Sequence, residues 1–368
     1  MHEFINYKTG EKLRCDFRTV SADSPELLRS LQICVRDEYG ETYPREDIYN
    51  LTRLADQIRT GRLTVLLAIA EDGDPVSSLA LSPCGWLTDV PEMTMHVVRK
   101  KYRGYGIGTV LTKALLRLPE ARNHCAVTAH SVTFHSMAQH QTLDCGLIPC
   151  GFLLNVHSNE VLRHSFDTKG CLKQSFAVSV FPENKCDVGA LYVPDAHKDF
   201  VLAIYRRLGI RSALKLGKKN TGSAQIALHR DETHHTVTAE IFKGGSDIGQ
   251  WAQSLIEDNR HPLQTVNVFL NLNDPGAPDT YEKLHSRGFV FTGLHPLCGN
   301  GEFMLLHHPM AMGLPLQKLC VDDGYSEVYK YICDCAEEVY EIDKSEDQSS
   351  AVAGIAARAC ADVCGHGG

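Results

Sequence analysis

A short basic stretch, RKKYRGYGIG at residues 99–108, has the composition of an anion-binding loop. Three of its residues are glycines and four are cationic. The preceding EMTMHVV reads as a strand, and apolar residues from Ile107 to Leu118 recur at helical spacing. Glycines let the backbone approach a ligand, and a helix start presents N–H groups and a positive dipole. The order strand, glycine loop, helix therefore predicts a phosphate-binding turn.

Other interpretations of the stretch are weaker. A Walker loop needs Gly-Lys-Ser/Thr, but Thr109 follows Gly108 directly, and no long parallel-strand series supports a dinucleotide fold. A glycine-rich turn with solvated lysines and no ligand is the remaining alternative. Lys100 and Lys101 are expected to be such a hydrated surface pair.

The motif resembles the acyl-CoA-binding pattern of the GCN5-related N-acetyltransferase (GNAT) superfamily, Arg/Gln-x-x-Gly-x-Gly/Ala. Arg103, Gly106 and Gly108 match it, and the resemblance extends over Leu13 to Asn155. It implies that the CoA pyrophosphate lies on the loop amides and that the pantetheine arm runs past the strand end. The cofactor-binding residues that it implies are Val98, Arg103, Gly104, Tyr105, Gly106, Ile107, Gly108 and Thr109.

The same resemblance suggests a catalytic base on the strand before the loop. Acyl transfer from a thioester to an amine needs proton removal and oxyanion stabilisation. Glu92 lies six residues before Val98, where some histone-type members carry a glutamate; its alternative role is a solvated strand-end carboxylate. By the two-residue period of a strand, His96 is expected on the same face as Glu92, so the two could cooperate through a water.

The general acid of the family is missing. The usual tyrosine, four residues before Gly-Phe, is replaced by Thr142 before Gly146-Leu147, so solvent or another group protonates the thiolate, or the chemistry differs. His130, His135 and His140 crowd this segment, and neutral imidazole suits proton transfer, although each could be structural. With Ser136 they suggest that this junction lines the substrate site. The catalytic candidates are Glu92, His96, His135 and Ser136.

No metal is expected. His135 and His140 are five residues apart, which misses the helical i,i+4 pair, and no Cys-x-x-Cys supports them. Cys360, Cys364 and His366 lie in a small-residue-rich tail and are interpreted as incidental.

The remaining elements of the first half fit the family order. Ser24 and Pro25 predict the start of a helix, and Asp72-Gly73 predicts the turn of a β-hairpin. CAVTAHS, HSMAQHQTLDCG and LIPCGFLLN would supply the strand, helix and strand that follow the CoA helix.

The second half weakly repeats the first. GLIPCGFLL from Gly146 resembles GFVFTGLHPL from Gly288, with two glycines five apart in each, and a hairpin, helix, strand and helix precede the second copy. FKGGSDIGQW lacks the Arg-x-x-Gly-x-Gly pattern, so the second half is expected not to bind CoA but to close the substrate cleft. A helix with an apolar stripe at Val328, Ile332, Cys335 and Val339 would cover the sheet.

The predicted fold class is α+β: two GNAT-like domains, each a mixed, mostly antiparallel sheet flanked by helices. The expected boundaries are 1–155 for the acyl-CoA-binding domain, 156–173 for a linker, 174–310 for the degenerate domain, 311–345 for the C-terminal helix and 346–368 for a mobile tail.

Composition limits the function. A net charge of −8 and a pI near 6.1 argue against a general nucleic-acid binder. Fourteen scattered cysteines, a polar start and the lack of a 20-residue apolar run indicate a cytoplasmic protein without a membrane partner.

Three function classes remain. The first is an acyltransferase that uses acetyl-CoA or another acyl-CoA to acylate an amine of a small molecule or peptide. The second is an aminoacyl-tRNA-dependent transferase, which the acidic balance and the intact loop disfavour. The third is a non-catalytic acyl-CoA sensor, which the missing tyrosine favours.

Overall fold

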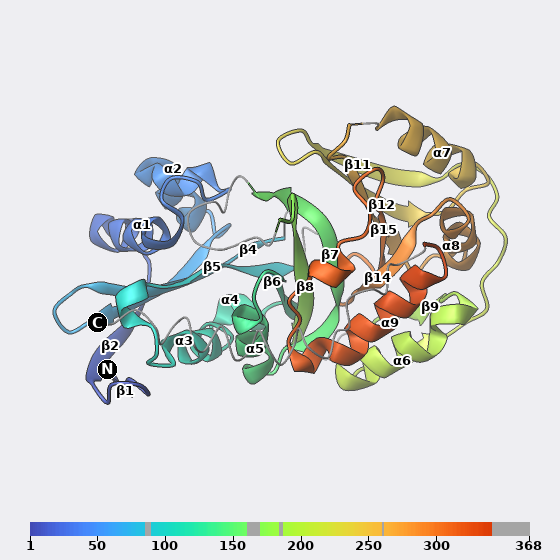
Figure 1. The fold of residues 1–368 in the computed structure, drawn as a ribbon. Coiled ribbons are helices and arrows are strands. Elements are labelled where there is room, and N and C mark those ends of the chain that lie inside the picture. Colours follow the sequence, from blue (N-terminus) through green and yellow to red (C-terminus); the bar gives the residue numbers. More distant parts are fainter. Residues whose placement is uncertain (85–89, 160–169, 184–186, 260, 341–368) are drawn as a thin grey trace.

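A single mixed sheet runs through the molecule in the computed structural model, which describes residues 1–84, 90–159, 170–183, 187–259 and 261–340 (Figure 1). Its thirteen strands follow the order β1-β2-β3-β4-β5-β6-β8-β7-β14-β15-β13-β12-β11. Most neighbouring strands are antiparallel, and helices cover both faces. The predicted α+β class with a mostly antiparallel sheet is therefore confirmed. The two halves, however, share this one sheet.

The first half begins with an antiparallel meander. Its strands are β1 (His2–Ile5), β2 (Lys12–Thr19), β3 (Thr64–Ala70), β4 (Pro75–Pro83) and β5 (Pro91–Val98). The predicted hairpin at Gly73 joins β3 to β4, and Gly73 has the positive φ of 86° that favours glycine there.

Two layers of helices cover the first half of the sheet. Above it in Figure 1 lie α1 (Pro25–Tyr39) and α2 (Leu51–Arg59), and below it lie α3 (Ile107–Leu115), α4 (Pro119–Arg122) and α5 (Met137–Asp144). Helix α1 begins at the predicted Pro25 and buries Leu28, Leu31 and Val35, whereas Ile33 is exposed. Separate apolar clusters fill the two sides, because successive strand residues point to opposite faces.

Strands β5 and β6 (Ala126–Val132) run parallel but separate early. Their register has only two pairs, Glu92 with Thr128 and Met93 with Ala129. Beyond these pairs the strands run on to Val98 and Val132 without pairing with each other. The glycine loop follows β5, and α5 follows β6, so both lie at the end where the strands have separated.

The first half is completed by two long strands, β7 (Ile148–Ser158) and β8 (Lys173–Pro182). Strand β8 lies between β6 and β7 and is antiparallel to both. This corrects the sequence analysis, which placed 156–173 in a linker and began the second domain at 174. The apolar run of β8 fits either half, and only long-range pairing assigns it to the first.

The second half repeats this arrangement. Its elements are β11 (Gln225–Asp231), β12 (Thr236–Lys243), α7 (Ile248–Asp258), β13 (Thr265–Asn271), α8 (Ala277–His285), β14 (Val290–His295) and β15 (Phe303–His308). The order β11-β12-β13-β15-β14 matches β4-β5-β6-β8-β7, including the parallel pair and the inserted last strand. The strand order therefore shows the repeat that the sequence suggested.

One feature differs between the two copies. Strands β12 and β13 stay paired over six residues, from Thr236 with Thr265 to Ile241 with Leu270. The parallel strands of the second half therefore do not separate as β5 and β6 do.

The remaining elements lie within the first half, between the two halves, or after the last strand of the second half. They are β9 (Ala190–Leu191), α6 (Lys198–Arg207), β10 (Ala213–Leu214), α9 (Ser326–Glu337) and the 3-10 turns η1 (Glu46–Tyr49), η2 (Lys100–Tyr102), η4 (Asp195–His197), η5 (Leu316–Lys318) and η6 (Asp323–Tyr325). In α9, Val328, Ile332 and Cys335 of the predicted stripe are buried, and the helix contacts β14 and β7. The predicted tail, 346–368, lies outside the described residues.

The halves join where β7 meets β14, at a pair of glycines. Gly151 and Gly293 are register partners and are the second glycines of the two repeat copies. A Cβ at Gly151 would lie 2.6 Å from the Thr292 carbonyl oxygen, and one at Gly293 would lie 2.3 Å from the Gly151 Cα. Only residues without a Cβ allow this approach of two backbones.

Lys173 is a second link between the halves. Its side chain is buried, and its Nζ donates to the hydroxyls of Thr236 and Thr265, each at 2.7 Å. Burial lowers the pKa of Lys173 to about 7.

Two further observations concern membrane-spanning helices and disulfide bonds. None of the described helices has the length and apolar character needed to cross a membrane. Cys125 is the one described cysteine in a disulfide.

Candidate active site at the glycine loop and strand β5

The predicted anion-binding loop has the required backbone. Gly104 and Gly106 have φ values of 90° and 70°, and left-handed Gly106 is the N-cap of α3. A Cβ at Gly106 would meet no atom within 4 Å. Because the first amides of a helix have no partner within it, the amides of Ile107, Gly108 and Thr109 can bind an anion.

The first residues of the chain support this loop. The Tyr7 amide donates to the Gly104 carbonyl at 3.0 Å, and the Asn6 side chain donates to the Arg103 carbonyl at 3.3 Å. A Cβ at Gly104 would lie 3.2 Å from the Asn6 side chain. The loop is therefore held from one side before any ligand binds.

Arg103 shapes the loop and is itself paired. Its Nε donates to the Val98 carbonyl at 3.2 Å, and its guanidinium forms a salt bridge with buried Glu38. The guanidinium thus ties the end of β5 to α1. It is also 46% exposed, so one side of it remains open to solvent.

Of the two preceding lysines, Lys101 is held by an ion pair rather than simply hydrated. Lys101 forms a 2.7 Å ion pair with Asp74, which also accepts from Arg99. Burial raises the pKa of Asp74, but hydrogen bonds from Lys101, Tyr102 and Arg99 outweigh this and lower it to about 2.

A bulge in β5 separates two of the predicted catalytic residues. The register with β4 shifts between Ser78 and Ala80, and Met95 has a positive φ of 51°. Met93 packs in the cluster with α3, whereas Met95 packs in the cluster with α1 and α2. The expectation that Glu92 and His96 share a face is therefore wrong, because the extra residue reverses the alternation.

The His96 side chain lies on the face of the sheet that α3 and α5 cover. Its Nε2 lies 3.1 Å from the Gln141 amide nitrogen, and that nitrogen also lies 3.2 Å from the Thr112 hydroxyl. Burial lowers the pKa of His96 to about 4. The imidazole is therefore neutral near pH 7.

Tyr43 contacts the bulge of β5 from the face opposite to His96, and the sequence analysis did not predict this contact. Its hydroxyl lies 2.9 Å from the Thr94 hydroxyl and accepts the Met95 amide hydrogen at 3.2 Å. Burial raises its pKa. Tyr43 follows α1 in an irregular segment, so no periodic pattern indicated that it reaches β5.

Glu92 lies on the α1 and α2 side with His130 of β6. Its carboxylate accepts from His130 Nδ1 at 3.0 Å and is 24% exposed. Burial raises the pKa of Glu92, but the His130 charge and hydrogen bond outweigh it, so the pKa lies below its ordinary value. The carboxylate is thus ionised and oriented by an imidazole, a partner that the sequence analysis did not assign to it.

The junction between β6 and α5 holds the other predicted residues. Burial lowers the pKa of His135 to about 4, and its carbonyl accepts from the Gln139 amide. Ser136 is the N-cap of α5, although its side chain makes no capping bond. His140 is exposed and pairs with Asp322 at 3.2 Å, away from the loop residues.

Thr142 occupies the position where the family carries its tyrosine. The Thr142 hydroxyl is buried and donates to the Gln139 carbonyl at 2.8 Å. It therefore stabilises α5 from within.

The corresponding loop of the second half already binds a carboxylate. The Gly244 amide donates to Asp274 at 2.7 Å, and a Cβ at Gly244 would lie 2.0 Å from the Thr280 hydroxyl and 2.6 Å from the Asn220 side chain. An acidic group and packed side chains thus occupy the place where an anion would approach. That the second half does not bind CoA stays a prediction.

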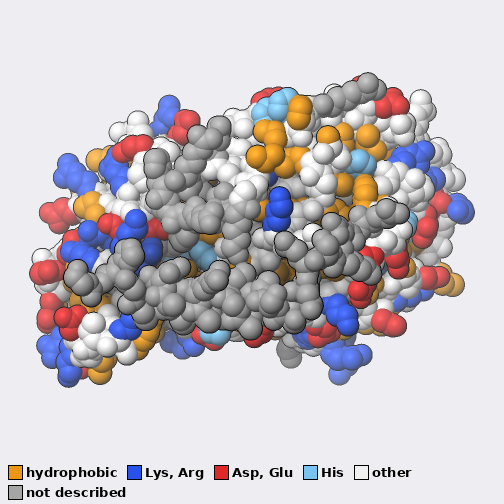
Figure 2. All heavy atoms as spheres, in the orientation of Figure 1, with side chains coloured by type: hydrophobic (Ala, Val, Ile, Leu, Met, Phe, Trp, Pro, Cys, Tyr) orange, Lys and Arg blue, Asp and Glu red, His pale blue; other side chains and the backbone are white. Residues whose placement is uncertain are grey.

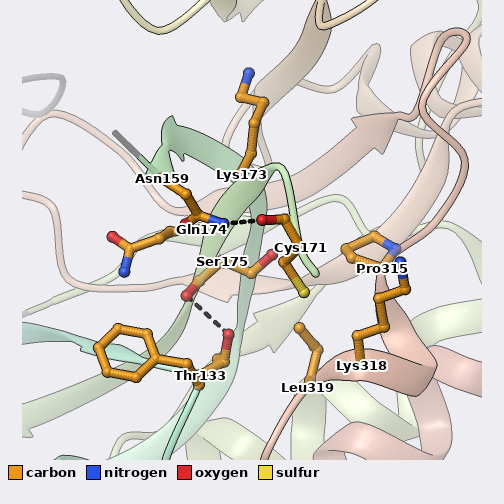
Figure 3. Close-up of a pocket in the computed structure, with 10 residues that line it drawn as sticks. Thr133, Asn159, Cys171, Lys173, Gln174, Ser175, Pro315, Lys318 and Leu319 are labelled. Carbon is orange, nitrogen blue, oxygen red and sulfur yellow. Dashed lines mark hydrogen bonds between the residues drawn. The ribbon is translucent and has the colours of Figure 1, made fainter. Parts of the chain in front are cut away.

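The hollow shown in Figure 3 lies at the start of β8 and is too small for a cofactor. Thr133, Ser175 and Leu319 are among its lining residues, and its volume is about 20 Å³, which is room for about one water molecule. The Thr133 hydroxyl closes one side by donating to the Ser175 carbonyl at 2.9 Å. The Lys173 ammonium points away from it.

Basic and acidic side chains are interspersed over the first half on the face shown in Figure 2. This distribution is unlike the continuous basic surface of nucleic-acid binders.

Comparisons with known proteins agree with the predicted resemblance. Residues 28–142 match the sequence model of the Acetyltransferase (GNAT) family. The search of curated proteins gives no match.

Matches among the solved structures include three acetyltransferases. A spermidine/spermine N-acetyltransferase from Vibrio cholerae is 15% identical and has a TM-score of 0.35, with 47% of this chain and 94% of that chain covered. An N-acetyltransferase from Staphylococcus aureus Mu50 is 14% identical and has a TM-score of 0.35, and the match covers 46% of this chain and 99% of that chain. A putative acetyltransferase from Acinetobacter baylyi ADP1 is 13% identical and has a TM-score of 0.36, and the match covers 46% of this chain and 93% of that chain.

The family match covers α1, the β3–β4 hairpin, β5, the glycine loop, β6 and α5. The chain therefore contains a domain of the GNAT acetyltransferase family, which confirms the predicted family and the predicted enzyme class, an N-acetyltransferase.

Proposed function

We propose that the first half binds one acyl-CoA, with acetyl-CoA the expected donor, and transfers the acyl group to an amine of a small molecule or peptide. The observation that carries the proposal is the left-handed Gly106 at the start of α3, beside two strands that separate. Free amides at that helix start suit a pyrophosphate, and the separated strands suit an extended pantetheine arm.

In this proposal Glu92 removes the proton from the attacking amine, directly or through a water. A carboxylate that accepts from His130 keeps one orientation, and its second oxygen can face an acceptor on the α1 and α2 side. Tyr43 and Thr94 lie on the same side and would help to position the amine.

His96, His135 and Ser136 would position the donor on the α3 and α5 side. With pKa values of about 4, the two imidazoles are neutral near pH 7, so neither supplies a proton to the leaving thiolate as an imidazolium. The proton would then come from solvent or from Glu92 once it has been protonated.

Calorimetric titration with CoA tests the binding half of the proposal. Wild type should bind one CoA per chain, and Gly106→Trp should lose binding because its side chain would fill the approach to the α3 amides. Gly73→Trp is the matched control, since Gly73 has a similar positive φ and open surroundings in a distant turn. Equal affinity of Gly106→Trp and wild type, or two CoA per chain, would contradict the proposal.

A non-catalytic acyl-CoA sensor is the second candidate. The buried, internally bonded Thr142 favours it, because a threonine hydroxyl in the place of the family's tyrosine is a much weaker acid toward a thiolate. The two candidates differ in thiol release: a sensor binds acyl-CoA but releases no free CoA when amines are added.

A further inference from the structure

A buried cluster of metal-ligand side chains lies where the two halves meet behind Glu92. Cys84 directly follows β4, His130 lies on β6, and His295 ends β14 of the second half. Their ligand atoms all lie within 4.8 Å of one another. Cys84 is 1% exposed, His295 is fully buried, and the His130 side chain is 5% exposed.

The hydrogen bonds of His130 and His295 direct the same nitrogen of each ring into this cluster. His130 Nδ1 donates to Glu92 at 3.0 Å, so Nε2 carries the lone pair when the ring is neutral. His295 Nδ1 lies 3.0 Å from the Cys298 sulfur, and that thiol donates to the His295 carbonyl at 3.1 Å. The Cys298 sulfur therefore accepts from Nδ1, which again leaves a lone pair on Nε2.

The two Nε2 atoms face each other at 3.4 Å. Two lone pairs at this distance repel unless a cation or a proton lies between them. Two nitrogens bound tetrahedrally to Zn²⁺ at about 2.0–2.1 Å are separated by about 3.3–3.4 Å, which matches this distance. The Glu92 carboxylate behind the outer nitrogen of His130 is a usual outer partner of a metal-bound histidine.

We infer that Cys84, His130 and His295 form a transition-metal site, suited to Zn²⁺, that joins the two halves beside Glu92. Two imidazoles and a thiolate favour Zn²⁺ over Mg²⁺ or Ca²⁺, which prefer oxygen ligands. Three protein ligands leave a fourth position for water or another donor. The inference departs from the sequence analysis, which expected no metal, because its ligands are 46 and 165 residues apart and share no local motif.

The site does not depend on the proposed acyltransferase function, so its test uses metal content. The full-length protein is stripped with chelator, dialysed against equimolar Zn²⁺ and analysed by elemental mass spectrometry. One tightly bound zinc per chain is expected, with at least a tenfold loss in His295→Ala and in Cys84→Ser. Co²⁺ in place of Zn²⁺ should give a thiolate-to-metal charge-transfer band that Cys84→Ser abolishes.

Matched variants separate this cluster from other ligands. His307→Ala removes a buried histidine of β15 outside the cluster, and Cys360→Ser/Cys364→Ser removes the tail thiols; both should retain the zinc. Circular dichroism checks that each variant is folded, and added zinc should raise the unfolding temperature of wild type but not of Cys84→Ser. No stoichiometric zinc in wild type, or zinc lost with the tail thiols and kept in His295→Ala, would overturn the inference.

Discussion

The contact between Gly151 and Gly293 gives the sharpest test of how the halves are joined. In Gly151→Ala the new Cβ would lie 2.6 Å from the Thr292 carbonyl oxygen, whereas ordinary contact begins at 3.4 Å. The two backbones must therefore move apart by about 0.8 Å, the difference of these distances. The Thr292 carbonyl oxygen is a backbone atom and cannot turn away from the new Cβ as a flexible side chain would, so the strain spreads into β7 and β14.

The expected cost follows from this displacement. Overpacking a tight site costs about 1–3 kcal/mol, and Gly151→Ala should lower the free energy of unfolding by that amount. Gly293→Ala should cost more, about 2–6 kcal/mol, because Gly293 also has a positive φ of 128° that strains a side chain by about 1–3 kcal/mol. Gly73→Ala is the control for Gly293→Ala, since Gly73 has positive φ but no close neighbour.

Urea unfolding followed by circular dichroism measures these differences. The double variant should lose less stability than the sum of the single ones, because both side chains need the same separation of strands. A Gly151→Ala protein within about 0.5 kcal/mol of wild type would show that β7 and β14 do not meet as described. Fully additive losses would show that the two sites are not in contact.

Three further predictions concern the site and the folded state. Glu92→Gln should lower kcat about a hundredfold or more while CoA affinity is retained, and a normal kcat would remove Glu92 from the base role. Between pH 7 and 10.5 the unfolded chain keeps a proton on Lys173 that the folded chain has lost, so this group makes stability rise with pH. The stability of wild type relative to Lys173→Met should therefore increase in urea titrations from pH 7 to 10, by up to about 1.4 kcal/mol per pH unit, and a constant difference would contradict the lowered pKa. Asp274→Ala should cost about 1–3 kcal/mol by leaving the Gly244 amide unpaired, and Asp274→Asn less; equal losses in the two variants would argue against this bond.

Local signals were sufficient for most of the elements. Pro25 marked the first helix, Asp72-Gly73 marked the hairpin, and the apolar repeat from Ile107 marked α3. The anion-binding loop was equally visible, because its requirements concern consecutive residues: glycines that accept positive φ and a helix start that supplies amides. The weak repeat of two glycines was a local pattern too, and it indicated the second half.

What the sequence could not determine depends on long-range pairing and on strand phase. The bulge at Met95 moved His96 to the other face from Glu92, and a single extra residue leaves no mark in an alternating pattern. Strand β8 was assigned to the wrong half, since its apolar run gives no information about its neighbours.

By itself, then, the sequence determined the α+β class and the loop, since backbone conformation and hydrophobic period are properties of neighbouring residues. The family followed from the resemblance of Arg103, Gly106 and Gly108 to a known motif. Only the tertiary structure decided that β7 and β14 fuse the halves into one sheet. It also brought His295 of the second half to His130 and Glu92 of the first. Residues 165 positions apart meet because the strands of the two halves join into one sheet at a glycine pair, and that is a consequence of packing that no local pattern encodes.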